Sequence, residues 1–84
     1  MPFTEMTMTE HRGVTFAVTE PDGNYRITVP GDMLDDECGA DADNARRIAW
    51  VEVNLAGVLS AYGARTEGGY VKSPYNRVMV EDLD

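Results

Sequence analysis

Six acidic side chains within twelve positions form the densest group of chemically active residues in this sequence. They are Asp32, Asp35, Asp36, Glu37, Asp41 and Asp43, and no Lys or Arg stands among them. Such a run could bind calcium, but an EF-hand loop that begins at Asp41 needs a glycine at its sixth position, where this chain has Arg46. The remaining interpretations are an acidic binding face, or acids that cap helices and hold water.

The residues that could act in catalysis stand apart from one another. His11 is the only histidine, and neither a second histidine nor a cysteine lies close to it in the sequence. A serine or cysteine nucleophile needs a base that a third group orients. Cys38 directly follows three acids, whose negative charge opposes formation of a thiolate. The sequence therefore predicts no catalytic residue, no metal site and no cofactor.

A different group of residues indicates contact with another surface. In a helix that runs through this part of the chain, Trp50, Val53, Gly57 and Ala61 lie opposite the apolar stripe. A lone exposed tryptophan is uncommon, and protein interfaces favour this residue. Either the N-terminal strand or the loop at 65–75 covers Trp50 within the chain, or a second protein covers it, and both interpretations stay open.

The size and charge of the chain restrict what these groups can do. Its 84 residues predict one domain, 1–84, which is too small for a deep enclosed active site. The net charge of -8 repels phosphate backbones and argues against direct nucleic-acid binding. No apolar run is long enough for a membrane span, no signal peptide is visible, and the single cysteine suits a reducing compartment. We therefore expect a cytoplasmic protein.

Alternating apolar residues predict the strands that position these groups. Residues 14–18 and 25–29 alternate with a period of two and are joined by a turn at 20–24 that contains Pro, Asp and Gly. This pattern is typical of a β-hairpin. Residues 77–81 alternate again and predict a third strand, and residues 6–8 could add a short fourth strand.

Two helices complete the predicted fold. Asp32 is placed to be the N-cap of a short helix that ends at Gly39. A long helix is predicted to begin after Asp41 or Asp43 and to run to about residue 64. Its core-facing stripe consists of Ile48, Val51, Leu55, Val58, Leu59 and Tyr62. The prediction is an α+β domain with one long and one short helix packed on one face of an antiparallel sheet of three or four strands.

Four segments of the chain carry a resemblance to a known family. They are Val14-x-Phe16-x-Val18, Leu34-Asp35-Asp36 before Gly39-Ala40-Asp41, Val51-x-x-Asn54-x-x-x-Val58-x-x-x-Tyr62, and Glu67-Gly68-Gly69 before Val78-Met79-Val80-Glu81-Asp82. In these segments the chain resembles a small bacterial domain family of unknown function, the one numbered 1488. It departs from that family at Leu55, where the family has Arg, and in extra residues at 70–76. The resemblance implies helices against an antiparallel sheet and brings no activity, cofactor or catalytic residue.

Together these observations predict a non-catalytic protein that acts through protein-protein contacts. The contact would be made by a partner protein or a second copy of the chain at Trp50, Val53, Gly57 and Ala61. The alternative is an acidic nucleic-acid mimic that blocks a basic DNA- or RNA-binding partner. An enzyme that uses surface carboxylates is the least favoured class, because no pair of acids stands in apolar surroundings that would separate their protonation.

Overall fold

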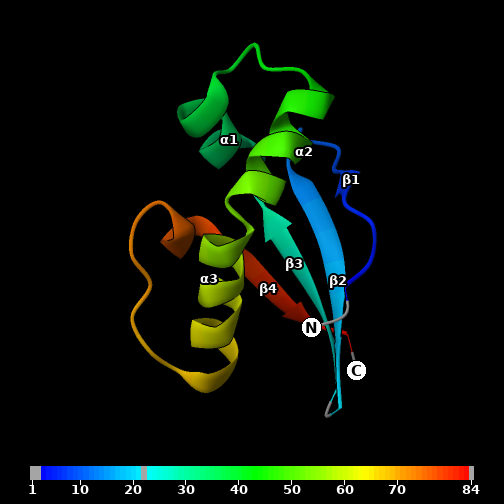
Figure 1. Ribbon diagram of the computed structural model, residues 1–84, viewed down its shortest axis with the longest axis vertical. Coiled ribbons are helices and arrows are strands. Elements are labelled where there is room, and N and C mark those ends of the chain that lie inside the picture. Colours follow the sequence, from blue (N-terminus) through cyan, green and yellow to red (C-terminus); the bar gives the residue numbers. More distant parts are fainter. Residues whose placement is uncertain (1–2, 22, 84) are drawn as a thin grey trace.

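The alternating segments form an antiparallel sheet, as the sequence predicts. The computed structural model describes residues 3–21 and 23–83. Its strands are β1 (Thr7–Met8), β2 (Val14–Glu20), β3 (Gly23–Val29) and β4 (Met79–Asp82), in the order β1-β2-β3-β4 (Figure 1). Each neighbouring pair is antiparallel. The predicted α+β class is therefore confirmed, whereas Asp22 of the predicted hairpin turn lies outside the described residues.

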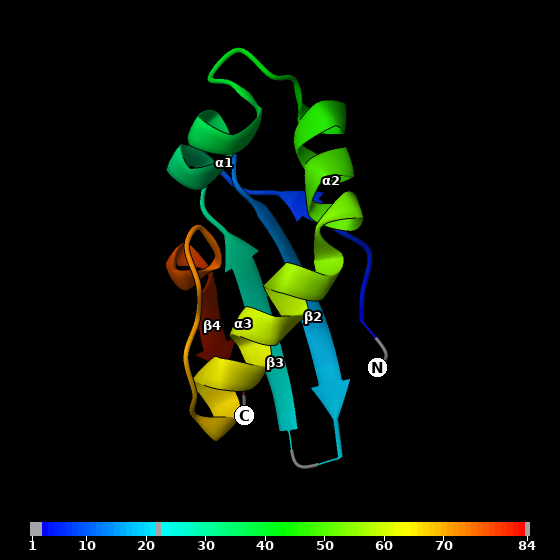
Figure 2. The ribbon, with the colours of Figure 1, turned by 60° about the vertical axis from the view of Figure 1, so that its left-hand side comes forward.

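Three α-helices cover one face of this sheet. They are α1 (Gly31–Cys38), α2 (Asn44–Val53) and α3 (Leu55–Glu67), and a short 3₁₀ helix, η1 (Tyr75–Arg77), precedes β4 (Figure 2). The hairpin turns alternate side chains towards these helices. Five of these side chains are at most 1% exposed: Val14, Phe16, Val18, Ile27 and Val29. Within the described part of the chain, no helix combines the length and apolarity needed to cross a membrane.

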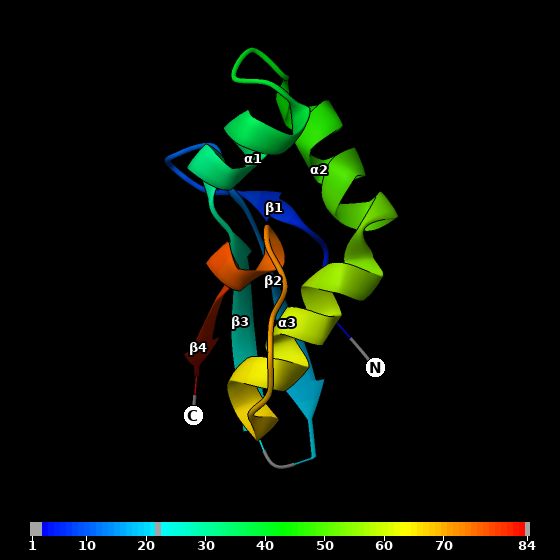
Figure 3. The same ribbon diagram turned by 90° about the vertical axis from the view of Figure 1, so that its left-hand side faces the viewer.

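The other face of the sheet is polar, because alternate residues of each strand point away from the helices. Thr15 and Thr28 are cross-strand partners there, and their hydroxyl oxygens are 3.2 Å apart. Arg26 is the cross-strand partner of Glu81 on the same face. Figure 3 shows the three helices together on the opposite side. The sheet therefore has one face in the core and one face of threonines and charged residues.

The single long helix of the sequence prediction is wrong, because the chain bends at Asn54. This residue separates α2 from α3, with φ of -103° and ψ of 21°. Its side-chain amide donates to the carbonyl of Trp50 at 2.8 Å, and its own backbone N–H donates to the same carbonyl at 2.9 Å. Asparagine competes in this way with regular helix hydrogen bonds. The bend leaves Val51, Val58 and Tyr62 buried, while the other members of the predicted stripe are only half-buried.

The short helix also begins earlier than predicted. Its N-cap is Pro30, and Asp32 lies in the first turn, where a carboxylate oxygen accepts from the backbone N–H of Met33 at 2.9 Å. Met33 and Leu34 are fully buried in the core. Gly39 ends the helix with φ of +103°, a conformation that favours glycine.

Arg47 of α2 is fully buried and joins the helices to the sheet. Sequence analysis did not single out this residue. Its partners are the carbonyl oxygens of Arg12, Gly31, Gly39, Ala40 and Ala42 and a carboxylate oxygen of Asp35, at distances from 2.6 to 3.3 Å. The guanidinium thereby connects the turn before β2, the start of α1 and the α1–α2 loop. A buried charge is tolerable only when it is satisfied in this way.

The turn between β1 and β2 lies directly against the start of α1. A side chain at Gly31 would overlap the backbone carbonyl of His11, so this contact requires a glycine. Arg12 adopts a left-handed conformation with φ of 64°. Its side chain donates to the carbonyls of Ala40 and Ala42, the second of which also accepts from Arg47. Two arginines therefore hold the α1–α2 loop.

We expect Arg47→Lys to destabilise the fold by about 3 to 5 kcal/mol, the cost of disrupting a buried ionic network. A lysine carries one nitrogen in place of three, so several of the carbonyl groups around Arg47 would lose their donor without gaining water. Chemical denaturation of the variant measures the loss.

The matched control for this prediction is Arg46→Lys, which makes the same replacement one residue earlier. Arg46 is exposed, and surface substitutions of this kind change stability by less than about 0.5 kcal/mol. Equal unfolding midpoints for the two variants would contradict the role given to Arg47.

Candidate functional site

The six clustered acids do not form one free acidic face. Asp35 pairs with Arg47 at 2.6 Å, and Asp32 and Asp36 pair with Arg77 at 3.0 and 2.7 Å. Asp43 caps α2 by accepting from the backbone N–H of Arg46 at 2.9 Å. All six side chains are exposed, including the two remaining members, Glu37 and Asp41. Most of the cluster therefore has a structural role within the chain.

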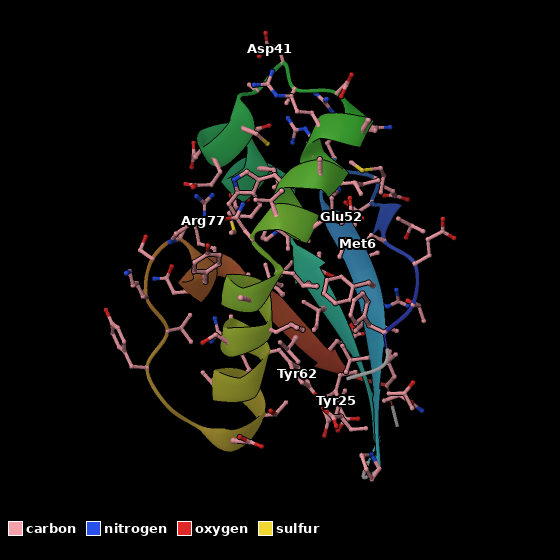
Figure 4. The ribbon with its side chains drawn as sticks, viewed as in Figure 1. Met6, Tyr25, Asp41, Glu52, Tyr62 and Arg77 are labelled. Carbon is pink, nitrogen blue, oxygen red and sulfur yellow. The ribbon has the colours of Figure 1, made fainter. Side chains whose placement is uncertain are left out.

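Arg77, at the end of η1, pairs with acids of α1, although η1 and α1 are far apart in the sequence (Figure 4). Its hydrogen bond to Asp36 is the main cause that raises the pKa of the guanidinium, and the bond to Asp32 adds to it. Partial removal from water opposes this rise. Because both carboxylates remain partly exposed, this ion pair orients the segment before β4 more than it stabilises the fold.

Trp50 is partly covered by Tyr75, from within the chain. The segment after α3 runs back along this helix to η1 (Figure 1). There the rings of Trp50 and Tyr75 have centroids 6.3 Å apart, and the Tyr75 hydroxyl donates to a side-chain oxygen of Asn54 at 3.3 Å. A side chain at Gly57 would overlap the Tyr75 ring. Gly57 is therefore a position of internal contact and is not part of an open face.

The predicted contact face is also reduced at its other end. Ala61 is fully buried, so its assignment to an outward face is wrong. Asn54 separates α2 from α3, and the small residues after it, Gly57 and Ala61, are covered within the chain. Val53 itself is 84% exposed. Of the predicted contact residues, those that leave apolar surface exposed therefore lie on α2, while Phe3, Tyr70, Met79 and Leu83 are exposed elsewhere on the molecule.

A cleft between α1 and α2 borders this exposed apolar surface. It has a volume of about 340 Å³ and is lined by Glu37, Cys38, Arg46, Ala49, Trp50, Val53 and Asn54. We call it the α1–α2 cleft. The Cys38 thiol donates to the carbonyl of Leu34 at 3.1 Å, which fits an internal structural role. The cleft is thus lined by apolar residues together with one acidic and one basic side chain.

His11 borders a second hollow, of about 500 Å³, between the turn before β2 and the start of α1. Two carboxylates, those of Asp32 and Asp35, also line this hollow. They are held by Arg77 and Arg47 respectively. Within residues 3–21 and 23–83, no group of three or more His, Cys, Asp or Glu side chains is placed to bind a metal ion.

A third hollow, which sequence analysis missed, lies between the hairpin and α3. Its volume is about 240 Å³, and it is lined by Glu20, Tyr25, Leu59, Tyr62, Gly63, Thr66 and Glu67. We call it the tyrosine cavity. Tyr62 appeared in the sequence only as a core residue, because helical periodicity does not show which strand residue it meets. The cross-strand register places Tyr25 on the core face beside Val18, which is the signal that could have found this contact.

Comparisons with protein-family models, curated proteins and solved structures find no match to this chain. Its resemblance to the domain family numbered 1488 therefore stays a prediction. The function has to be argued from the sites themselves.

We expect Gly57→Ala to displace Tyr75 from Trp50 with little effect on stability. The added methyl group would overlap the end of the tyrosine side chain, which can rotate away, while alanine favours the helix by roughly 0.5 to 1 kcal/mol. Trp50 is the only tryptophan. Its emission should shift to longer wavelength, and its quenching by acrylamide should increase.

The control for this prediction is Gly63→Ala in the same helix. A side chain at Gly63 meets no atom within 4 Å, so the fluorescence of Trp50 should stay as in the unaltered protein. Unchanged emission in Gly57→Ala would show that Tyr75 does not cover Trp50.

Proposed function

We propose that this chain is a non-catalytic binding module that contacts another protein through the α1–α2 cleft. The observation that carries the proposal is the exposure of Val53, at 84%, beside the half-buried ring of Trp50. Together they form an apolar surface on one helix, next to a cleft into which a side chain can enter. The partner is a protein that inserts an aliphatic or aromatic side chain into this cleft.

The chemistry of the cleft supports this kind of partner. Interfaces place an aromatic anchor in the centre and polar residues around it. Here Trp50 and Ala49 supply apolar lining, and Glu37 and Arg46 line the same cleft with opposite charges. Because Trp50 is already supported by Tyr75, its ring is held in place before binding, which lowers the entropic cost of association.

The nucleic-acid mimic is a weaker proposal for this chain. A mimic has to present its carboxylates to a basic partner, and such binding depends on their charge. Three acids of the cluster, Asp32, Asp35 and Asp36, are instead paired with arginines of the same chain. This pairing favours the apolar contact over mimicry.

Val53→Asp should weaken binding to the partner while leaving the fold intact. The side chain is almost wholly exposed, so an aspartate stays hydrated in the free protein but would enter the apolar contact in the complex. We expect at least about a tenfold loss of affinity, as for a central interface residue. Affinity capture with the unaltered and variant chains, followed by sedimentation of the purified chain, distinguishes a partner protein from a second copy.

Leu83→Asp is the matched control, because it places the same charge on another exposed apolar residue outside the cleft. A partner that binds the α1–α2 cleft should still bind the Leu83→Asp control, and it should also bind in high salt. Two results together would contradict the proposal and favour mimicry. The partner would still bind Val53→Asp, and its binding would be lost either in high salt or in the double variant Glu37→Gln with Asp41→Asn.

A further inference from the structure

The tyrosine cavity combines two aromatic rings with carboxylates at one end of the molecule. Tyr25 of β3 and Tyr62 of α3 have ring centroids 5.5 Å apart and an angle of 64° between their planes. Figure 4 shows the two residues next to each other below the bend between α2 and α3. At such an angle the edge of one ring faces the other ring, as is usual for aromatic pairs. Both residues line a hollow of about 240 Å³.

A hydrogen bond fixes one carboxylate on the wall of this cavity. The Tyr62 hydroxyl donates to a carboxylate oxygen of Glu20 at 3.1 Å. Glu20 ends β2 and is only partly exposed, whereas the tyrosine is 4% exposed and is held in the core. The carboxylate therefore belongs to the ordered framework and is not a freely moving surface charge.

The electrostatic character of the cavity is negative. A second carboxylate, that of Glu67, lines it at the end of α3, where the helix dipole also favours positive charge. None of the described residues that line the cavity is a lysine or arginine. The nearest basic residue of this helix in sequence, Arg65, donates to the carbonyl of Asn76 at 2.8 Å and is not among the lining residues.

One lining residue of the cavity is a glycine with open space beside it. A side chain at Gly63 would meet no atom within 4 Å. Thr66 lines the wall, and its hydroxyl donates to the carbonyl of Tyr62 at 3.1 Å. The cavity thus accepts a group with the size of a substituted ammonium without movement of the backbone.

We propose that the tyrosine cavity binds an alkylammonium group, held by the rings of Tyr25 and Tyr62 and the carboxylates of Glu20 and Glu67. Cations are attracted to the faces of aromatic rings, and a carboxylate at the same place adds charge pairing. The site lies at the far end of α3 from the α1–α2 cleft and does not depend on the protein contact proposed there. The ammonium group comes either from a small quaternary amine or from a lysine side chain.

The proposal is tested by titration of the isotope-labelled protein, followed by backbone amide NMR. The first probe is choline, and its control is the uncharged isostere in which carbon replaces the quaternary nitrogen. Both probes have the same shape, so only charge separates them. We expect choline to bind about fivefold more tightly or better, as judged by shifts of the Gly63 and Thr66 amides. Matched sodium chloride additions remove the general effect of salt.

A second pair of probes identifies the source of the ammonium group. These are lysine and norleucine, each blocked at both backbone ends. Tighter binding of the blocked lysine than of choline assigns the site to a lysine side chain, and the reverse order assigns it to a small quaternary amine. Both rankings support an alkylammonium site, provided that the blocked norleucine binds more weakly than the blocked lysine.

Substitutions at Glu67 and Tyr25 test two of the residues named, and Glu52→Gln is the control. Glu67→Gln should weaken choline binding by about two- to fivefold, since an exposed charge pair contributes this much. Glu52→Gln makes the same change at an exposed position of α2 outside the cavity and should have no effect. Tyr25→Leu should lower affinity by about fivefold, whereas Tyr25→Phe keeps the ring and should retain binding within about twofold.

The proposal is overturned if choline and its uncharged isostere bind equally, or if choline does not move the Gly63 and Thr66 amides in the millimolar range. It is also overturned if Glu67→Gln and Glu52→Gln have the same effect. Both glutamates are exposed, so these two variants keep the fold and the result does not depend on the stability of the tyrosine variants.

Discussion

The need to satisfy one buried charge governs how the two layers of this protein meet. Arg47 reaches five carbonyl groups and the carboxylate of Asp35 from a position without contact to water. Those partners come from the turn before β2, from α1 and from the loop that follows it. A guanidinium can join three such segments because its donors point in fixed and different directions. The position of α1 on the sheet, and with it both walls of the α1–α2 cleft, follows from this network.

The sheet could be predicted from the sequence because each strand carries its own signal. The alternation of apolar and polar residues in β2, β3 and β4 reflects which face of the sheet is buried. The burial of their side chains in the structure follows the same alternation. The bend at Asn54 and the burial of Arg47 were missed because the long helix was predicted to be continuous, and neither residue was singled out within it as a bend or a buried group. A sign was present, since Arg47 lies one turn before Val51 and therefore on the core side of α2. Its neighbour Arg46, of the same type, is exposed.

The candidate sites were less predictable than the fold, because their properties depend on contacts between distant segments. The acids of α1 appear unpaired in the sequence, but Arg77 reaches two of them although α2 and α3 lie between them in the chain. Trp50 was expected to be covered either by the chain or by a partner, and Tyr75 covers part of it while Val53 stays open. The tyrosine cavity requires the register of β3 and the path of α3 together. Local periodicity contains neither piece of information.

The pairing of β4 with β3 has a consequence for the order in which the fold is completed. Thr28 of β3 pairs with Met79 of β4, so β4 leaves the ribosome only after all three helices have been made. Until then the hairpin presents an unpaired edge that can join another strand. The nascent chain therefore passes through a stage in which its helices can already pack while one edge of its sheet can still pair with another strand. Arg77, two residues before β4, is held by acids of α1, which brings β4 to the edge of β3 with which it pairs.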